Sequence, residues 1–183
     1  MGSSYPDSIS VGSLMPYSSN LTLLDLIAEQ VRRTPHHIAF RFEQDCLNYL
    51  ELDCFANHLG HQLRDAGIKK GDPVALIFNN SLEYPVTLLA LLKLGAIWVP
   101  LDKDWGAKRL NMALSHLAPK TVLTNLVSSE NYPWRQVDLD QLNHVSEDPK
   151  TKLIPSDPIY GFFTSGSTGI PKCCLLYTSL MAR

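Results

Sequence analysis

The stretch VALIFNNSLEYPVTLLALLKLGAIWVPL, residues 74–101, combines two kinds of apolar pattern. Val74–Phe78 is a short continuous apolar run, which is typical of a parallel strand that is buried on both faces. A leucine-rich segment follows, with Ser81 as its predicted N-cap and Gly95 just past its end, and this pattern predicts a helix. Ile97–Leu101 is a second apolar run. We therefore predict a strand–helix–strand unit with parallel strands.

Upstream of this unit, the sequence predicts two capped helices separated by a hairpin. Thr22 and Asp25 have the spacing of a capping box, in which each side chain binds the backbone of the other residue at a helix start. Asn48 and Glu51 repeat this spacing before a longer helix with one apolar face. Residues 38–47 are β-prone around a polar turn, which predicts a small hairpin. The N-terminal part thus adds two helices and a hairpin.

Downstream of this unit, helix and strand continue to alternate. Leu110, Leu114 and Leu117 follow helical spacing, and Thr121–Thr124 is a short β-prone run. A polar, poorly patterned stretch comes next, and Ile159–Phe163 is the last predicted strand. Strands that alternate with helices are typical of an α/β fold. We predict an α/β fold built of parallel βαβ units.

The composition excludes several classes of function. The chain has 183 residues and a net charge of −2, with 45% hydrophobic and 19% charged residues. These values predict a packed core, and no basic excess indicates a nucleic-acid partner. No apolar run is long enough to cross a membrane, and residues 1–20 are a Ser-rich segment without a secretory signal, which we interpret as a mobile tail. Four cysteines show neither zinc-site nor disulfide spacing, which favours the cytoplasm.

The last predicted strand leads into TSGSTGIPK, residues 164–172, which has the composition of an anion-binding loop. Its threonines and serines supply four hydroxyl groups within five residues, and its glycines let the backbone approach a ligand closely. Successive backbone N–H groups in such a turn form a concave anion site, and Lys172 adds a positive charge. Because ligands of α/β folds gather at the carboxyl ends of strands, we predict that this loop binds a polyphosphate.

Other interpretations of the loop stay open on composition alone. A segment rich in Ser, Gly and Thr is also typical of a solvated turn. The order of residues differs from the G-x-x-x-x-G-K-[ST] phosphate loop and from the G-x-G-x-x-G dinucleotide fingerprint. It also differs from the G-x-S-x-G turn of hydrolases, because Phe163 stands two residues before Ser165. An unrelated phosphate-binding enzyme and a non-catalytic scaffold or pseudoenzyme are therefore alternatives.

Three motifs resemble the adenylate-forming enzymes, which include acyl-CoA ligases, luciferases and the adenylation domains of nonribosomal peptide synthetases. Residues 164–172 resemble the phosphate-binding signature of this family. Residues 47–52, LNYLEL, resemble its L-T-Y-x-E-L motif, with Asn48 in place of Thr. Residues 92–102, LKLGAIWVPLD, resemble its L-K-A-G-x-A-Y-V-P-[IL]-D motif, with Trp98 near the usual Tyr. Residues 49–52, YLEL, and residues 99–102, VPLD, favour the peptide-synthetase branch over plain CoA ligases.

The resemblance covers residues 21–172 and implies a partial adenylation domain, within the N-terminal subdomain of an adenylate-forming enzyme. It implies that the parent protein uses ATP and Mg²⁺ to convert an amino acid, or another carboxylic acid, into an acyl-adenylate. A phosphopantetheine on a carrier-protein domain would then accept the acyl group, or CoA in an acyl-CoA ligase. The family's other catalytic groups and its metal-binding acid lie downstream, so this chain alone is expected to be inactive, with no catalytic residue or metal ligand assigned. The residues implied to bind the ATP phosphates are Thr164, Ser165, Gly166, Ser167, Thr168, Gly169 and Lys172.

Two further groups of residues have structural interpretations. Tyr49 and Glu51 open a helix and Gly95 precedes a strand, so we interpret the two upstream motifs as scaffold. His58 and His61 are three residues apart on a helix, which is a spacing that could hold a metal. The apolar face of that helix lies on its other side. We therefore predict plain surface histidines.

The end of the chain departs from the family pattern. Cys173 stands where the family has a glycine, and residues 174–179, CLLYTS, have no counterpart in that pattern. One back-translation of these residues resembles a reading frame of the transposon end used in sequencing-library adapters. We predict that residues 173–183 are a non-native tail, with a divergent native segment or a truncated gene as the alternative.

Overall fold

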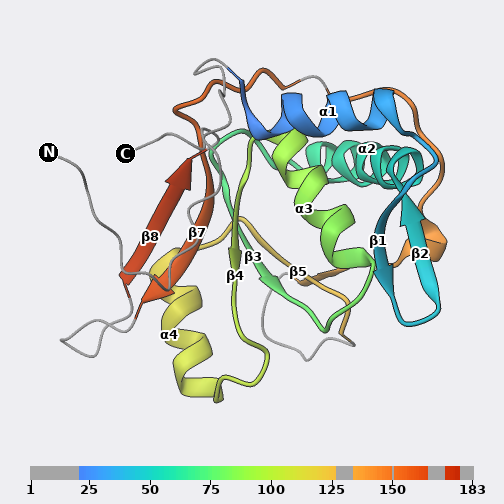
Figure 1. Cartoon of the computed structure of the whole chain (residues 1–183). Helices are drawn as coiled ribbons and strands as arrows, with labels where there is room; N and C mark the ends of the chain where they lie inside the picture. The colour runs from blue at the N-terminus through green and yellow to red at the C-terminus, as the bar shows by residue number, and fades with distance from the viewer. Residues whose placement is uncertain (1–20, 127–133, 150, 165–171, 178–183) are drawn as a thin grey trace, which may run out of the picture.

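The computed structural model describes residues 21–126, 134–149, 151–164 and 172–177 (Figure 1). The helices are α1 (Leu23–Arg33), α2 (Tyr49–Asp65), α3 (Glu83–Leu94) and α4 (Ala107–Leu117), with a short 3₁₀ helix η1 (Leu139–Gln141). None of the described helices is long and apolar enough to cross a membrane. The strands are β1 (Ile38–Phe42), β2 (Asp45–Asn48), β3 (Pro73–Ile77), β4 (Ile97–Pro100), β5 (Thr121–Thr124), β6 (Trp134–Gln136), β7 (Pro158–Thr164) and β8 (Lys172–Tyr177).

Strands β3, β4 and β5 form the parallel centre of the main sheet, as predicted. Within the described residues, the sheet has six strands in the order β6-β5-β3-β4-β7-β8. β3 shares four residue pairs with β4 and four with β5, whereas β7 shares only the pair Trp98–Tyr160 with β4. β1 and β2 form the predicted hairpin, which is a separate two-stranded sheet. The parallel βαβ architecture predicted from the sequence is therefore confirmed.

The prediction that β7 is the last strand is wrong. β8 follows it and pairs with it in antiparallel register, from Pro158–Tyr177 to Thr164–Lys172. β8 was not predicted because its apolar residues lie in the segment interpreted as a non-native tail. Backbone pairing does not depend on the origin of a segment, so the origin of residues 173–183 stays a prediction.

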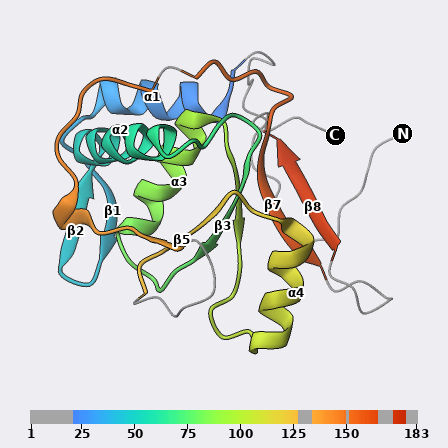
Figure 2. The same ribbon diagram turned by 180° about the vertical axis from the view of Figure 1, so that it is seen from behind.

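Two hydrophobic cores lie on opposite faces of the main sheet (Figures 1 and 2). Successive side chains of a strand point to opposite faces. Val74 and Leu76 of β3 accordingly pack with α2 and α3, whereas Ala75 and Ile77 pack with α4. Both faces of β3 are thus covered, which explains why its sequence is apolar throughout.

Helix α3 begins differently from the prediction. Ser81 does not cap it, because the helix begins at Glu83 with Leu82 at the N-cap position and no side-chain cap bond. The Ser81 hydroxyl instead accepts a hydrogen bond from Asn125 Nδ2 at 2.8 Å. Gly95 ends the helix in the left-handed conformation (φ 66°), as its position predicted.

The other predicted helix starts are confirmed. Thr22 N donates to Asp25 Oδ2 at 2.8 Å, and the Thr22 hydroxyl accepts from Asp25 N, so α1 begins with a capping box. Asn48 and Glu51 make the equivalent pair of bonds, 2.9 and 2.8 Å long, at the start of α2. These bonds satisfy backbone donors that the first helical turn leaves unpaired.

Candidate functional site

Strand β7 ends at the carboxyl edge of the parallel strands, where the predicted loop begins. Its last residue, Thr164, is exposed and pairs through the backbone with Lys172, the first residue of β8. The loop therefore leaves and re-enters the sheet at one point, and two of the predicted site residues face each other across its base. The predicted site residues that lie outside the described part of the chain are Ser165, Gly166, Ser167, Thr168 and Gly169.

Gly161 allows strands β4, β7 and β8 to pack closely just before this point. A Cβ atom on Gly161 would lie 2.9 Å from Val99 Cγ2 of β4 and 3.1 Å from Cys173 Sγ of β8. Such contacts are too short for ordinary packing, so any larger residue would push β7 away from one neighbour. Burial raises the pKa of the Cys173 thiol, and Cys174 adds to the effect. The close approach fixes where the end of β7 lies.

An aromatic cluster holds the end of β7 against helix α4. The Phe163 ring lies edge-on to Trp105, with 6.5 Å between ring centroids, and 6.4 Å from the His116 ring. The Arg109 guanidinium lies 4.0 Å from the centroid of the Trp105 ring, which is a cation–π contact. Phe163 directly precedes Thr164, so the cluster anchors the residue from which the loop starts. The cluster was not predicted from the sequence. The spacing of Trp105 and Arg109, four residues apart, is the one sequence feature that indicates part of it, the cation–π contact.

The carboxyl ends of β3 and β5 are tied together by Asn125. Its Oδ1 accepts from Asn79 N at 2.8 Å, and its Nδ2 donates to Asn79 O at 3.4 Å and to the Ser81 hydroxyl at 2.8 Å. The side chain thus imitates a backbone pair and holds the turn after β3 beside the end of β5. No local pattern predicts this contact, since one Asn after a strand is common.

A pocket of about 560 Å³ lies on the opposite face of the sheet from Phe163. Its mostly apolar lining comes from α1, β1, α2, α3 and Trp98, and includes Phe40 and Leu88. Tyr84 lies on its wall. Burial raises the pKa of the Tyr84 phenol, and the neighbouring Tyr160 adds to the effect. This second concave surface carries none of the predicted phosphate-binding residues.

The two histidines of α2 are not plain surface residues, contrary to the prediction. His58 Nδ1 accepts from Asn143 N at 2.8 Å, and His61 Nε2 lies 2.8 Å from the Glu147 carbonyl oxygen. Both rings therefore bind the backbone of the segment between β6 and β7. Within the described residues, no group of three His, Cys, Asp or Glu side chains could hold a metal ion, and we assign no Mg²⁺ ligand in this chain.

The comparison with protein families identifies the family to which the chain belongs. Residues 27–182 match the family model of AMP-binding enzymes. The chain belongs to this family. The matched region contains the two upstream motifs, β7, the loop and β8. The family resemblance of the three sequence motifs is therefore confirmed.

The chain is also similar to parts of known peptide synthetases. Gramicidin S synthase 2 of Brevibacillus brevis is 33% identical over 162 residues, which are 85% of this chain and 4% of that protein. The N-terminal subdomain of Klebsiella oxytoca NpsA, in complex with 3-hydroxybenzoyl-AMSN, superposes with a TM-score of 0.74 at 28% identity, covering 86% of this chain and 41% of the subdomain. NpsA-ThdA, an artificially fused adenylation–PCP di-domain from the same organism, gives 0.76 at 28% identity, covering 88% and 33%.

The share of each similar protein that is covered shows that the chain matches only part of it. The chain spans less than half the length of each of these three proteins. Its α/β fold matches part of the N-terminal subdomain of an adenylation domain, as the sequence predicted.

Proposed function

We propose that the protein to which this chain belongs activates an amino acid with ATP, as an adenylation domain of a nonribosomal peptide synthetase. The observation that carries this proposal is the pairing of Thr164 with Lys172 at the carboxyl end of β7, in a chain of the AMP-binding family. A polyphosphate is bound by hydrogen-bond donors and cations. Thr164 supplies a hydroxyl and Lys172 a cation at the two ends of one loop.

The proposed role of the loop follows from where charge develops in the reaction. The substrate carboxylate attacks the α-phosphorus of ATP, the acyl-adenylate forms, and pyrophosphate leaves. Negative charge grows on the leaving pyrophosphate, so fixed donors and a cation at the β- and γ-phosphates lower the barrier. The residues that we propose for this contact are Thr164, Ser165, Gly166, Ser167, Thr168, Gly169 and Lys172.

The packing around β7 supports this role because it holds the base of the loop in place. Phe163 is fixed by Trp105, and Gly161 lets β7 lie close to β4. A displacement of about 1 Å in a catalytic group can cost about 100-fold in rate, so a rigid base is useful to a loop that orients phosphates. ATP is the substrate that supplies the adenylyl group; the loop residues would orient its β- and γ-phosphates.

We propose a carrier-protein phosphopantetheine as the thiol that accepts the acyl group. The similarity to the NpsA-ThdA di-domain, in which an adenylation domain is fused to a PCP, supports a carrier-protein partner. All four cysteines, which lie in the described part of the chain, are unpaired, in keeping with a reducing cytoplasmic location. We propose that Mg²⁺ enters with ATP, and no step is assigned to it here.

The test is substrate-dependent exchange of pyrophosphate into ATP, measured on the full-length protein. Each proteinogenic amino acid, a set of aryl acids and a set of fatty acids would be supplied in turn. We expect exchange with one amino acid or a few related ones, well above the rate without acid. Exchange with fatty acids alone, followed by transfer to CoA, would favour an acyl-CoA ligase. A folded protein that shows no exchange with any acid would leave the non-catalytic scaffold as the explanation.

A further inference from the structure

The chain takes an indirect path from β6 to β7. Three strands, β5, β3 and β4, separate these two in the sheet, so the connection must cross these three strands. It does so by passing over the helices that cover one face (Figures 1 and 2). We call residues 137–157 the crossover. β7 shares a single residue pair with β4 and six with the edge strand β8, so its regular pairing with the parallel strands is limited to that one pair.

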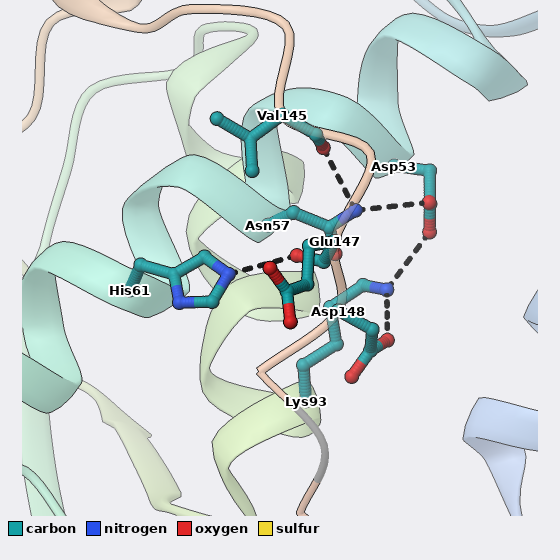
Figure 3. A network of polar contacts seen from close by, with 7 residues as sticks. All are labelled: Asp53, Asn57, His61, Lys93, Val145, Glu147 and Asp148. Carbon is teal, nitrogen blue, oxygen red and sulfur yellow. Dashed lines mark hydrogen bonds and ion pairs between the residues drawn. The ribbon is translucent and has the colours of Figure 1, made fainter.

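A buried lysine joins the crossover to two helices (Figure 3). Lys93 lies in the last turn of α3 and is 3% exposed. Its Nζ lies 2.9 Å from Asp53 Oδ1 of α2 and 2.7 Å from Asp148 Oδ2 of the crossover. Burying an ammonium group costs free energy unless carboxylates pair with it. Removal of one of these carboxylates leaves part of that cost uncompensated. Three segments are therefore held at one point.

Helix α2 adds contacts to the backbone of the crossover (Figure 3). Asn57 Nδ2 donates to the Val145 carbonyl oxygen at 3.0 Å and to Asp53 Oδ2 at 3.3 Å. His61 Nε2 lies 2.8 Å from the Glu147 carbonyl oxygen. Residues four apart on a helix share one face, so the three α2 side chains form a single stripe that faces the crossover. The bonds of Asn57 and His61 hold the crossover backbone, and the Lys93 ion pair holds the Asp148 side chain.

The contacts continue from this stripe to the start of β7. Gly60 leaves room for the crossover, because a Cβ atom there would lie 2.8 Å from Pro149 Cγ. Asp157, the residue before β7, forms an ion pair with Lys70 at 2.7 Å, and its Oδ2 accepts from Ile154 N at 2.7 Å. The crossover is thus held at its middle by α2 and α3 and at its end by the turn before β3.

We propose that Lys93, Asp53 and Asp148 form a positioning network that sets where strand β7 lies against the parallel sheet. The network acts through the crossover on β7, and through β7 on Thr164 at the base of the loop. It also gives the two upstream motifs a shared role, since Lys93 lies in residues 92–102 and Asp53 directly follows residues 47–52. The effect on ATP rests on the proposed function; the effect on strand position does not.

Hydrogen exchange separates positioning from a general contribution to stability. A network that only stabilises the fold would, when weakened, raise amide exchange in all the buried strands together. A positioning network would raise exchange in the crossover and β7 and leave β3 protected, because β3 has its own pairs and its own apolar cover. Within one protein, β7 therefore reports on the network and β3 serves as the internal reference.

The first experiment compares Asp148→Asn with Asp65→Asn by hydrogen exchange and mass spectrometry on the full-length protein. Asp65 is the matched control, because it also pairs with a cation, Arg64 at 3.6 Å, but on the exposed side of α2. We expect about tenfold faster exchange of β7 amides in Asp148→Asn, and less than about twofold change in β3 or in the control. Unchanged β7 exchange, or equal acceleration of β3 and β7, would overturn the proposal. Asp53→Asn gives a second, independent variant.

The second experiment measures pyrophosphate exchange as a function of ATP. We expect Asp148→Asn to raise the KM for ATP about tenfold with a smaller change in kcat, and Asp148→Glu, which keeps the carboxylate, to restore most of the affinity. An unaltered KM with protected β7 amides would reject the network. If no acid supports exchange in any variant while β7 still loosens in Asp148→Asn, the proposed function fails and the network stands.

Discussion

The central strands and the strand that carries the loop are held by different means. β3 shares four residue pairs with each neighbour, and its side chains are buried on both faces. β7 shares one pair with β4, and its other neighbour, β8, carries the exposed Leu175 and Leu176. The centre is fixed by its own apolar residues, whereas β7, which pairs along its length with the edge strand β8, has two further ties from outside the sheet: Lys93 through the crossover, and the aromatic cluster at Phe163.

The difference suits the proposed function. Segments that bind a ligand and move during turnover come from the less stable parts of a fold. A strand that is tied at its start and at its end keeps a fixed position, and it therefore also fixes the position of Thr164, its last residue. The predictions below weaken one region at a time, from the largest expected effect to the smallest.

Truncation of a core side chain should strongly destabilise the molecule, whereas the same change at the edge should not. Leu76 of β3 is 1% exposed, and Leu175 of β8 is 44% exposed. We expect Leu76→Ala to lower the free energy of unfolding by about 3 kcal/mol, because it leaves a cavity, and Leu175→Ala to change it by less than about 0.5 kcal/mol. Urea unfolding measures both. Equal losses would contradict the distinction between centre and edge.

Removal of the loop lysine should reduce activity without loosening the core. A lost charge-assisted contact is worth about 1.5–3 kcal/mol, so we expect Lys172→Ala to lower kcat/KM for ATP by roughly one to two decades in pyrophosphate exchange. Tyr49→Phe, at the start of α2, is the control and should act mainly on stability. Unchanged kinetics for the Lys172 variant would remove this residue from the site.

A methyl group at the close approach of β4, β7 and β8 should displace β7. Gly161→Ala places a Cβ atom 2.9 Å from Val99 Cγ2, so we expect a loss of about 1–3 kcal/mol in the free energy of unfolding. Gly106→Ala is the matched control, since no heavy atom beyond its chain neighbours lies within 4 Å of its added Cβ; it should cost less than about 1 kcal/mol, through the loss of a favourable N-cap residue. A Gly161 variant as stable as the control would show that β7 can shift freely.

The smallest expected effect concerns Cys54, which reports on the charge network. Burial raises the pKa of its thiol, Asp53 raises it further, and Lys93 lowers it. The folded state therefore holds this proton more tightly than the unfolded state. This contribution to stability is complete below the unfolded pKa, about 8.5, and is lost as the pH rises from there through the higher folded pKa. Asp53→Asn should lower the Cys54 pKa, measured by thiolate absorbance against a Cys54→Ala reference. A rise would contradict the assigned direction.

The sequence predicted the elements whose signals are local. The capping pairs Thr22–Asp25 and Asn48–Glu51 and the helix-ending Gly95 each act within a few residues, and all three are confirmed. Short apolar runs predicted β3, β4 and β5 because both faces of these strands are buried. The α/β fold followed from their alternation with helices.

The predictions that failed depend on distant residues. The Ser81 hydroxyl is bound by Asn125, 44 positions away in the sequence, and helix α3 begins after it, with Leu82 at the N-cap position. Lys93 meets Asp148 55 positions away, and no local pattern indicates that contact. For the candidate site, the motif indicated Thr164 and Lys172, but the anchors around Phe163 come from Trp105 and helix α4, and their contact with Phe163 became visible only in the fold.

The most direct test of the contrast between the two regions is native-state hydrogen exchange of the unmodified protein across a urea series. It gives, for each amide, the free energy and the exposed surface of the opening that permits exchange. We predict that β7 amides open with a lower free energy and a smaller urea dependence than β3 amides, because β7 can leave the sheet while the centre stays folded. The same free energy and the same urea dependence in both strands would mean that they unfold as one unit, and would contradict the account.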